Sequence, residues 1–316
     1  MVTAVPSITD REIASQPESW HRAARSVAPF SAALPRRGER VAVIGCGTSW
    51  FMAIAYARLR EGGGHGLTDA FAASEFPAGR DYDRVLGVTR SGTTTEVLDL
   101  LAAVSGTAST SVITADPAAP VMGIAESAAV LEWADEESVV QTRFATTALA
   151  LLRAHLESQS ALPAGVRAVS RAVEDAGRAL AAPLTTDMTE AGQLTFLGSG
   201  WTYGLALEAG LKMREAAGSW TEAYPAMEYR HGPISIAEPG RVTWAFGPVP
   251  DGLADDVARA GGAFVAGSTN RAADLDPMAD LVRAQRLAVC VAQSRGHDPD
   301  RPRNLSRSVI LGDDRA

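Results

Sequence analysis

Lysine is almost absent from this sequence, because 28 of its 29 basic residues are arginine and the single lysine is Lys212. An encoding preference for arginine explains most of this bias, since either residue supplies a positive charge. Lysine differs in that its compact amine can lose its proton when buried, whereas a guanidinium stays charged. A lone lysine three residues before Glu215 therefore indicates a site that needs an ammonium. Taken alone, a helix-surface ion pair with Glu208 at i,i+4 spacing is the simpler interpretation, and it would contribute about 0.2–0.5 kcal/mol.

Cysteine, long apolar runs and a surplus of positive charge are also missing. The two cysteines, Cys46 and Cys290, give neither a disulfide framework nor the spacing of a metal site. No apolar run approaches the ~20 residues that span a bilayer, and the N-terminus lacks the apolar core of a signal peptide. A formal charge of −8 argues against a general nucleic-acid surface. We therefore expect a cytoplasmic protein that needs no metal or other cofactor and binds neither nucleic acid nor a membrane.

A strand, a glycine loop and a helix follow one another twice in the chain. Residues 41–50, VAVIGCGTSW, and residues 194–203, LTFLGSGWTY, each end a short apolar run in a Gly-x-Gly loop. A helical stretch follows each loop, and runs such as DRVLGVTRSG and RVTWAFGP predict further strands. We therefore expect a duplicated α/β fold with two similar domains. Each should be a parallel sheet flanked by helices, in three layers of the flavodoxin-like or Rossmann-like kind.

The same patterns place the helices and the domain boundaries. Residues 9–35 should be helical and open at a capping box formed by Thr9 and Glu12. A long helix is expected from Val139 to Ser158, and LAVCVAQ near the end of the chain is either a strand or a buried segment. The expected order is a helical extension at 1–37, a first domain at 38–160, a helical linker at 161–184 and a second domain at 185–316.

Two hydroxyl-rich loops in the first half have the composition of a phosphate site. GCGTS at 45–49 and TRSGTTT at 89–95 each lie between an expected strand and an expected helix. In parallel α/β sheets, ligands bind at this edge, where the N–H groups of helix N-termini converge. The alternative is that the hydroxyls only cap the two helices. A dinucleotide site is disfavoured because Trp50 stands where GxGxxG needs its last glycine. The second half lacks a Ser-rich loop, so only the first half should bind phosphate.

Together these motifs resemble the sugar isomerase (SIS) domain family in its tandem form. GCGTS followed by TRSGTT is similar to the family's paired sugar-phosphate loops. The second half resembles the isomerase portion of glucosamine-6-phosphate synthase, with counterparts to ALEAGLKMRE, EAY, EYRHGP and PRNLSRSV. The resemblance covers about residues 38–312, and it implies two SIS-type domains and a sugar phosphate as the small-molecule ligand.

The resemblance also implies roles for individual residues. Glu215 matches the acid that moves a proton between C1 and C2 of the sugar, Lys212 the neighbouring lysine, and His231 the histidine linked to ring opening. In the family this histidine typically reaches in from the partner subunit, which implies a homodimer with shared active sites. The implied phosphate ligands are Thr48, Ser49, Thr89, Ser91 and Thr94, and the implied sugar-binding residues are Gly47, Val139 and Gln141.

The residue chemistry independently favours proton transfer at this helix. Lys212 and Glu215 are three residues apart and share a helix face. An ammonium beside Glu215 favours the ionised form that a base needs, and it could stabilise an enediolate formed next to a carbonyl. Histidine as a residue type can give and take a proton near neutral pH, so His231 is a candidate for moving the proton at the ring oxygen, although a lone histidine is more often structural.

Departures from the family pattern bear on the activity. Arg307 stands where the synthase has a tail lysine, and arginine cannot form a Schiff base. The glutamine-hydrolysing part of the synthase also has no counterpart in this sequence. We therefore expect an aminosugar-phosphate deaminase/isomerase. The alternatives are a fructosamine-6-phosphate deglycase, a glutamine-independent synthase-like aminotransferase, a plain aldose–ketose isomerase, and a sugar-phosphate sensor that does no chemistry.

Overall fold

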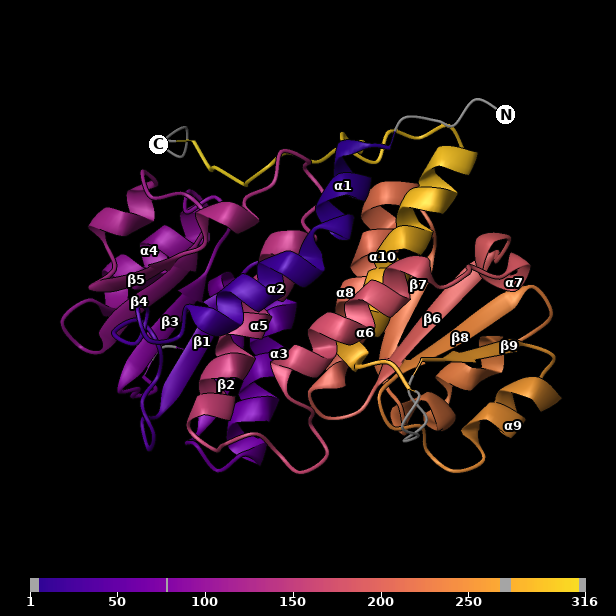
Figure 1. Ribbon diagram of the computed structural model, residues 1–316, viewed down its shortest axis with the longest axis horizontal. Helices are drawn as coiled ribbons and strands as arrows, with labels where there is room; N and C mark the ends of the chain where they lie inside the picture. The colour runs from indigo at the N-terminus through magenta and orange to yellow at the C-terminus, as the bar shows by residue number, and fades with distance from the viewer. Residues whose placement is uncertain (1–5, 78, 268–273, 313–316) are drawn as a thin grey trace. The chain divides into compact units, whose positions relative to one another are not determined.

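The computed structural model describes residues 6–77, 79–267 and 274–312 (Figure 1). The chain forms two compact units, each with its own parallel sheet. We call them the first-sheet unit, which contains Ser19–Glu136, Arg143–Val169 and Ser306–Ala316, and the second-sheet unit, which contains Met1–Glu18, Glu137–Thr142 and Ser170–Leu305. Each unit is thus assembled from separate stretches of chain, whereas the predicted domain boundaries were consecutive.

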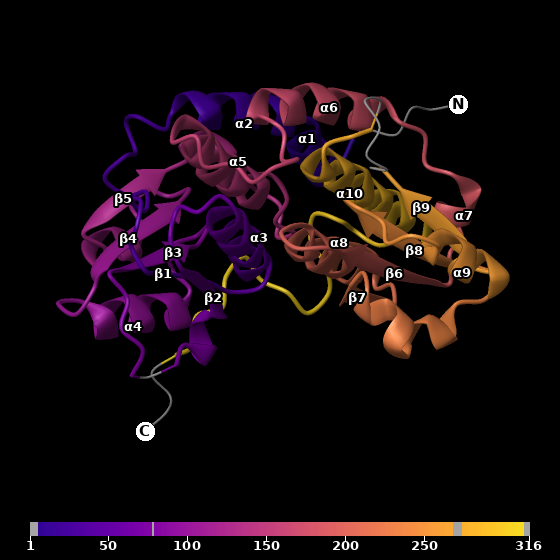
Figure 2. The same cartoon turned by 90° about the horizontal axis from the view of Figure 1, so that it is seen from below.

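The first sheet has the strand order β2-β1-β3-β4-β5, and all its neighbouring strands are parallel. The crossovers from β1 to β2 and from β3 to β4 run toward opposite edges, so right-handed connections place α3 and α4 on opposite faces (Figure 2). The elements of this unit are β1 (Val41–Gly45), β2 (Thr68–Ala72), β3 (Arg84–Val88), β4 (Ser109–Thr114), β5 (Ser127–Val130), α2 (Gln16–Arg25), α3 (Thr48–Gly62), α4 (Thr95–Val104), α5 (Arg143–Ser158), η1 (Ala73–Glu75), η2 (Pro120–Gly123) and η3 (Glu132–Ala134).

Apolar residues fill both faces of this sheet. Ala42 and Ile44 of β1 pack in one cluster with Val97 and Leu101 from α4. Val43, which lies between Ala42 and Ile44 and points to the other face, is also fully buried, as a central parallel strand covered on both faces requires. The strand β2 was not predicted, because its sequence TDAFA lies at the sheet edge and is only partly apolar.

The second sheet repeats this arrangement in the order β7-β6-β8-β9, again with parallel pairing. LAVCVAQ, which the sequence left open between a strand and a buried segment, lies in α10, a helix that packs against α8. The elements are β6 (Gln193–Gly198), β7 (Thr221–Pro225), β8 (Arg241–Phe246), β9 (Ala263–Ala266), α1 (Ile8–Ala14), α6 (Val169–Ala181), α7 (Thr186–Thr189), α8 (Thr202–Ala217), α9 (Leu253–Arg259), α10 (Pro277–Ser294), η4 (Glu228–His231) and η5 (Pro233–Ile236).

The duplication predicted from the sequence is confirmed at the level of backbone geometry. A Cβ on Gly45 would lie 2.8 Å from Ser49, and one on Gly198 would lie 2.4 Å from Thr202, so both strands end against the following helix. Two residues later, Gly47 and Gly200 have φ values of 53° and 58°, in the left-handed region that favours glycine. The fold is therefore two similar parallel α/β units, as expected.

The helical N-terminus begins earlier than predicted, and its cap is a different one. Ser7 is the N-cap of α1 and forms the capping box with Asp10. The hydroxyl of Thr9 instead donates to Asp300 at 2.7 Å. The carboxylate of Glu12 accepts the backbone N–H of Glu137 at 2.6 Å and so serves another segment of the same unit. The prediction of a Thr9–Glu12 capping box was wrong, because both side chains make long-range contacts.

The long helix α5 also begins at Arg143 and not at Val139 as predicted. The backbone N–H of Arg143, the first residue of the helix, donates to Glu136 Oε1 at 2.6 Å. Glu136 therefore satisfies an amide that the helix itself leaves free, and the helix starts at that point. Within residues 6–77, 79–267 and 274–312, no helix is long and apolar enough to cross a membrane, and no three His, Cys, Asp or Glu residues are grouped to hold a metal.

Two histidines are buried together in the first-sheet unit. His65 and His155 meet edge to face with ring centroids 5.5 Å apart, and they are 1% and 8% exposed. Burial lowers the pKa of both imidazoles, that of His155 to about 4, and the neighbouring charge of Arg60 acts in the same direction. Both rings are therefore neutral in the folded chain near neutral pH.

This pair should make the stability of the protein depend on pH below neutrality. An unfolded histidine gains its proton near pH 6.5, whereas folded His155 gains it only near pH 4. The unfolded state thus binds more protons between these values, so the free energy of unfolding falls as the pH falls through that window. His155→Asn should reduce the loss between pH 7 and pH 5 by about 2 kcal/mol, measured by urea unfolding. The exposed His21→Asn is the control, and an unchanged pH dependence in His155→Asn would contradict the assignment.

Candidate functional site

Lys212 is buried in α8 between two carboxylates. Its side chain is 1% exposed, and its Nζ lies 3.6 Å from Glu208 Oε1 and donates a hydrogen bond to Glu215 Oε2. The spacings i−4 and i+3 put both carboxylates on the same face of the helix as the ammonium. Glu208 is itself fully buried. The interpretation of Glu208 and Lys212 as a helix-surface ion pair was therefore wrong.

Glu215 differs from Glu208 in that it reaches a cavity. Its side chain is 18% exposed and lines a hollow of about 340 Å³ in the second-sheet unit. One oxygen thus faces the buried ammonium while the carboxylate remains open to a ligand. Of the two partners of Lys212, only Glu215 is placed to exchange a proton with a bound molecule. The cavity is also lined by Arg214, Ala216, Gly218, Gly296, His297, Asp298, Arg301, Pro302, Arg303 and Asn304.

Three arginines bring positive charge to this cavity. Arg214 donates to the hydroxyl of Thr221 at 2.9 Å, which holds its guanidinium in place. Arg301 and Arg303 are exposed, and within the described residues neither has an ion-pair partner. These arginines were not predicted to line the site, because in a chain whose basic residues are nearly all arginine their residue type carries little information. The cavity beside Glu215 can therefore accept an anionic group.

His231 and the two residues predicted to frame the sugar also belong to the second-sheet unit. His231 ends η4 and is exposed, and Gly232 follows it with φ 136° before Pro233 opens the next turn. The backbone N–H of Val139 donates to the carbonyl of Asp300 at 3.1 Å. The side-chain amide nitrogen of Gln141 is buried and has no hydrogen-bond partner, so a donor is available there.

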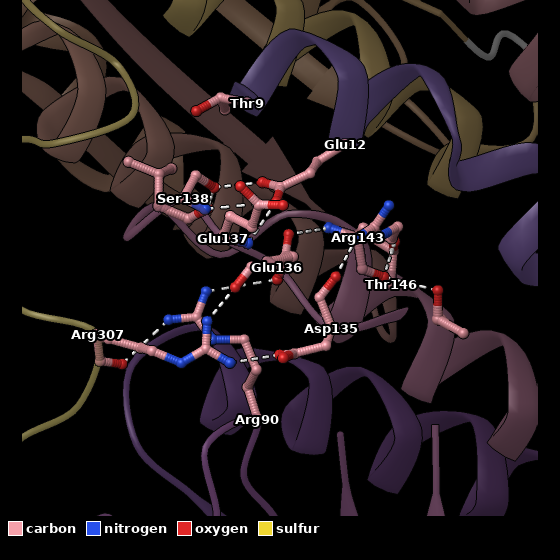
Figure 3. A network of polar contacts seen from close by, with 12 residues as sticks. Thr9, Glu12, Arg90, Asp135, Glu136, Glu137, Ser138, Arg143, Thr146 and Arg307 are labelled. Atoms are coloured by element: carbon pink, nitrogen blue, oxygen red, sulfur yellow. Dashed lines mark hydrogen bonds and ion pairs between the residues drawn. The ribbon is translucent and has the colours of Figure 1, made fainter. Parts of the chain in front are cut away.

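The segment that carries Val139 and Gln141 is held by hydrogen bonds to Glu12. This carboxylate accepts from the backbone N–H groups of Glu137 and Ser138 at 2.6 and 3.3 Å, and also from the Ser138 hydroxyl (Figure 3). Three hydrogen bonds on one carboxylate restrict the chain just before the two sugar-framing positions.

The first hydroxyl-rich loop lies at the N-terminus of α3, in the first-sheet unit. Gly47 is the N-cap, and no side chain caps the helix. Thr48 and Ser49 are the first residues of the helix and are each 4% exposed. The interpretation of these hydroxyls as helix caps is therefore wrong. The backbone N–H of Ser49 donates to the carbonyl of Cys46 at 3.2 Å, whereas that of Thr48 makes no hydrogen bond within the described residues and stays available to an anion.

The second loop folds on itself after β3. The hydroxyl of Thr89 accepts the backbone N–H of Gly92 at 3.2 Å, and that of Ser91 accepts the N–H of Thr93 at 3.3 Å. Gly92 has φ 62°, and a Cβ there would lie 2.5 Å from Ala119, so the turn needs glycine. Thr94 is the N-cap of α4, again without a side-chain cap. The Gly92 and Thr93 amides are thus bonded within the loop, and the Thr95 amide donates to the carbonyl of Val309 at 3.3 Å, so the loop presents mainly hydroxyls that the helix does not use.

Arg90 lies in this loop but does not contribute a free charge. It is 5% exposed, and its guanidinium lies 3.6 Å from the carboxylate of Glu136, which is fully buried.

Burial raises the pKa of the Cys46 thiol in the first loop, as expected for a packed residue and not for a nucleophile. Any phosphate here would be bound by hydroxyls and backbone N–H groups.

Removing the buried ammonium should destabilise the protein strongly. In Lys212→Met, two carboxylates would share one helix face without the ammonium that lies between them, and we expect a loss of about 3–5 kcal/mol in the free energy of unfolding, measured with urea. The double variant Lys212→Met/Glu208→Gln should recover part of this loss. Arg259→Met, which breaks an exposed pair with Asp256, is the control and should change stability by less than about 1 kcal/mol. A similar small loss in Lys212→Met would contradict the buried-charge interpretation.

The chain has relatives in sequence and in structure, although no protein-family model matches it. Glutamine–fructose-6-phosphate aminotransferase (isomerizing) of Methanothermobacter thermautotrophicus is 30% identical over 306 residues, which cover 86% of this chain and 52% of that protein. The chain thus spans about half the length of the curated relatives it matches.

Two solved structures share the fold along almost their whole length. Glucosamine-6-phosphate deaminase from Thermotoga maritima superposes with a TM-score of 0.80 at 22% identity, covering 96% of this chain and 100% of its own. Tagatose-6-phosphate ketose/aldose isomerase from Escherichia coli superposes with a TM-score of 0.78 at 18% identity, covering 100% and 99%. The chain therefore has the two-domain fold of the sugar isomerase (SIS) proteins and is homologous to the isomerase (SIS) part of the glutamine–fructose-6-phosphate aminotransferases.

Proposed function

We propose that this protein isomerises a phosphorylated amino sugar and releases ammonia, as an aminosugar-6-phosphate deaminase/isomerase. The observation that carries the proposal is the asymmetric pair around Lys212, with Glu208 fully buried and Glu215 open to a cavity. A carboxylate that accepts a hydrogen bond from a buried ammonium is held in one direction, and a general base needs such a fixed orientation.

In the proposed reaction, Glu215 removes the proton from C2, next to the C1 carbonyl of the open amino sugar, and returns it to C1. The nitrogen is then part of an imine at C2, and water hydrolyses this C–N double bond to a ketone and ammonia. Lys212 is too deeply buried to meet the substrate directly, so it acts through Glu215 by holding its Oε2. His231 moves the proton at the ring oxygen when the sugar opens. Its exposure on η4 fits the proposal that it serves the partner subunit of a homodimer.

The substrate phosphate is assigned to the two loops of the first-sheet unit. Thr48, Ser49, Thr89, Ser91 and Thr94 are the proposed ligands, and their loops offer hydroxyls and uncapped helix N-termini without a free cation. Gly47, Val139 and Gln141 are the proposed sugar-binding residues, with the unpartnered Gln141 amide as a hydrogen-bond donor.

One observation favours a second candidate function, a fructosamine-6-phosphate deglycase. Arg301 and Arg303 line the cavity next to Glu215 and are free to bind an anion. Ammonia has no anionic group that these arginines could bind, whereas an amine derived from an amino acid has a carboxylate. A synthase-like aminotransferase is less well supported, since Arg307 cannot form a Schiff base.

A panel of substrates separates these functions. Glucosamine 6-phosphate, galactosamine 6-phosphate, fructose 6-phosphate and a fructosamine 6-phosphate of an amino acid are incubated with the protein, and ammonia, free amino acid and product sugar are measured. We expect ammonia from an aminosugar phosphate. Release of the amino acid alone would support the deglycase. Tight binding without turnover of any compound would overturn both and support a sensor.

The role of Glu215 can be tested by removing its charge alone. Glu215→Gln should lower kcat by about 10²–10⁴ and leave KM nearly unchanged, because a positioned base contributes about that factor and the phosphate contacts remain. Glu190→Gln, an exposed glutamate of the same unit, is the matched control and should retain full activity. A loss of substrate binding with little change in kcat would contradict the assignment of Glu215 as the base.

A further inference from the structure

The C-terminal residues 306–311 run beside the second hydroxyl-rich loop, and we call them the tail segment. Thr93 donates its hydroxyl hydrogen to the Ser308 hydroxyl at 3.0 Å, the backbone N–H of Thr95 donates to the carbonyl of Val309 at 3.3 Å, and that of Leu311 donates to the Thr95 hydroxyl at 3.0 Å. Val309 and Ile310 are 55% and 68% exposed, so the burial of apolar side chains does not hold the segment in place.

Arg307 is the strongest attachment of the tail segment. Its guanidinium donates to the carboxylate of Asp135 and to the backbone carbonyl of Glu136 (Figure 3). These acceptors are adjacent in the chain and lie just before α5. A guanidinium has donors in a fixed fork and can bond both, whereas an ammonium is a single point of charge.

Arg90, which belongs to the second hydroxyl-rich loop, contacts both the tail segment and Glu136. Its guanidinium donates to the backbone carbonyl of Arg307 at 3.0 Å and faces the carboxylate of Glu136 at 3.6 Å. Glu136 thus contacts both arginines, Arg307 through its carbonyl and Arg90 through its carboxylate. The loop, the residues before α5 and the tail segment therefore form one closed circuit of hydrogen bonds and ion pairs.

The position of Arg90 gives this circuit a functional consequence. Arg90 stands between Thr89 and Ser91, so fixing its side chain also restrains the backbone that carries both hydroxyls. We propose that Arg307 is a positioning residue, which latches the tail segment onto residues 89–95 and thereby holds the phosphate-binding hydroxyls in place. This inference rests on the proposed function in one respect, namely that these hydroxyls bind the substrate phosphate.

The rival explanation is that Arg307 binds the phosphate directly through its charge. The two explanations differ in what they expect of Asp135, which the latch needs and a direct phosphate contact does not. Asp135→Asn should weaken the latch as Arg307→Ala does, whereas it would leave a direct contact intact or strengthen it by freeing the guanidinium.

The experiment measures kcat, KM and amide hydrogen exchange in Arg307→Ala, Arg307→Lys, Asp135→Asn and the double variant Arg307→Ala/Asp135→Asn. We expect Arg307→Ala and Asp135→Asn each to raise KM about fivefold with kcat nearly unchanged, and to speed exchange at the Thr95 amide. The double variant should have a KM no higher than that of either single variant, because both substitutions remove the same Arg307–Asp135 contact. Arg307→Lys should raise KM and the exchange rate at the Thr95 amide less than Arg307→Ala does. Arg80→Ala, which breaks an exposed pair with Asp69 in the same unit, is the control.

Different failures have different meanings. Unchanged exchange at Thr95 in Arg307→Ala, or an unchanged KM in Asp135→Asn, would overturn the latch whatever the substrate is. Ser91→Ala tests the phosphate assignment itself and should raise KM. If exchange rises in Arg307→Ala but neither it nor Ser91→Ala changes KM, the phosphate assignment is wrong and the positioning role falls with it. If Ser91→Ala raises KM and Arg307→Ala does not, the positioning role alone is overturned.

Discussion

Burying an ammonium is costly unless opposite charges lie close to it, and α8 meets this condition within its own turns. Glu208 and Glu215 flank Lys212 at one helical turn on either side, so the secondary structure itself brings the three charges together. The two carboxylates then differ in exposure and in their contact with the ammonium, which donates a hydrogen bond to Glu215 and lies 3.6 Å from Glu208. Glu208 is closed off, and Glu215 faces the cavity. The proposed chemistry depends on this difference, because a base must meet both its counter-charge and its substrate.

In the first-sheet unit, by contrast, the charged side chain near the proposed ligand is paired with a buried carboxylate. Its hydroxyl-rich loop contains Arg90, yet the buried carboxylate of Glu136 takes up that charge. What remains for an anion are hydroxyls and the amides at helix N-termini, which bind phosphate by geometry and partial charge. An acidic protein can therefore bind a phosphate ester without a basic surface, which agrees with a formal charge of −8.

Much of this could be predicted from the sequence, and the limits have physical causes. The Gly-x-Gly loops predicted both sheets, because a Cβ would clash at Gly45 and Gly198, and Gly47 and Gly200 have positive φ values that favour glycine. The spacing of Lys212 and Glu215 predicted a shared helix face, but spacing says nothing about burial, so the surface pair stayed the simpler interpretation. Local patterns also assigned Glu12 to a cap, whereas its partners are 125 and 126 residues away in the chain.

Other features rest on contacts of this long-range kind. The partners of Arg307 lie 171 and 172 residues away, at Glu136 and Asp135, and no local pattern points to them. LAVCVAQ was ambiguous for a different reason. A helix that is covered on most sides has no polar face, and so it lacks the periodicity that separates a helix from a buried strand.

The duplicated strand–loop–helix unit also has a consequence for helix polarity. The unit appears as β1 with α3 and as β6 with α8, but its two helices are used at opposite ends. At α3 the proposed ligand meets the N-terminal turn, where the aligned peptide dipoles favour an anion. At α8 the cations Lys212 and Arg214 occupy the last two turns, where the same dipole has its negative end. One duplicated element thus supplies two electrostatic environments of opposite sign, without any change in backbone design.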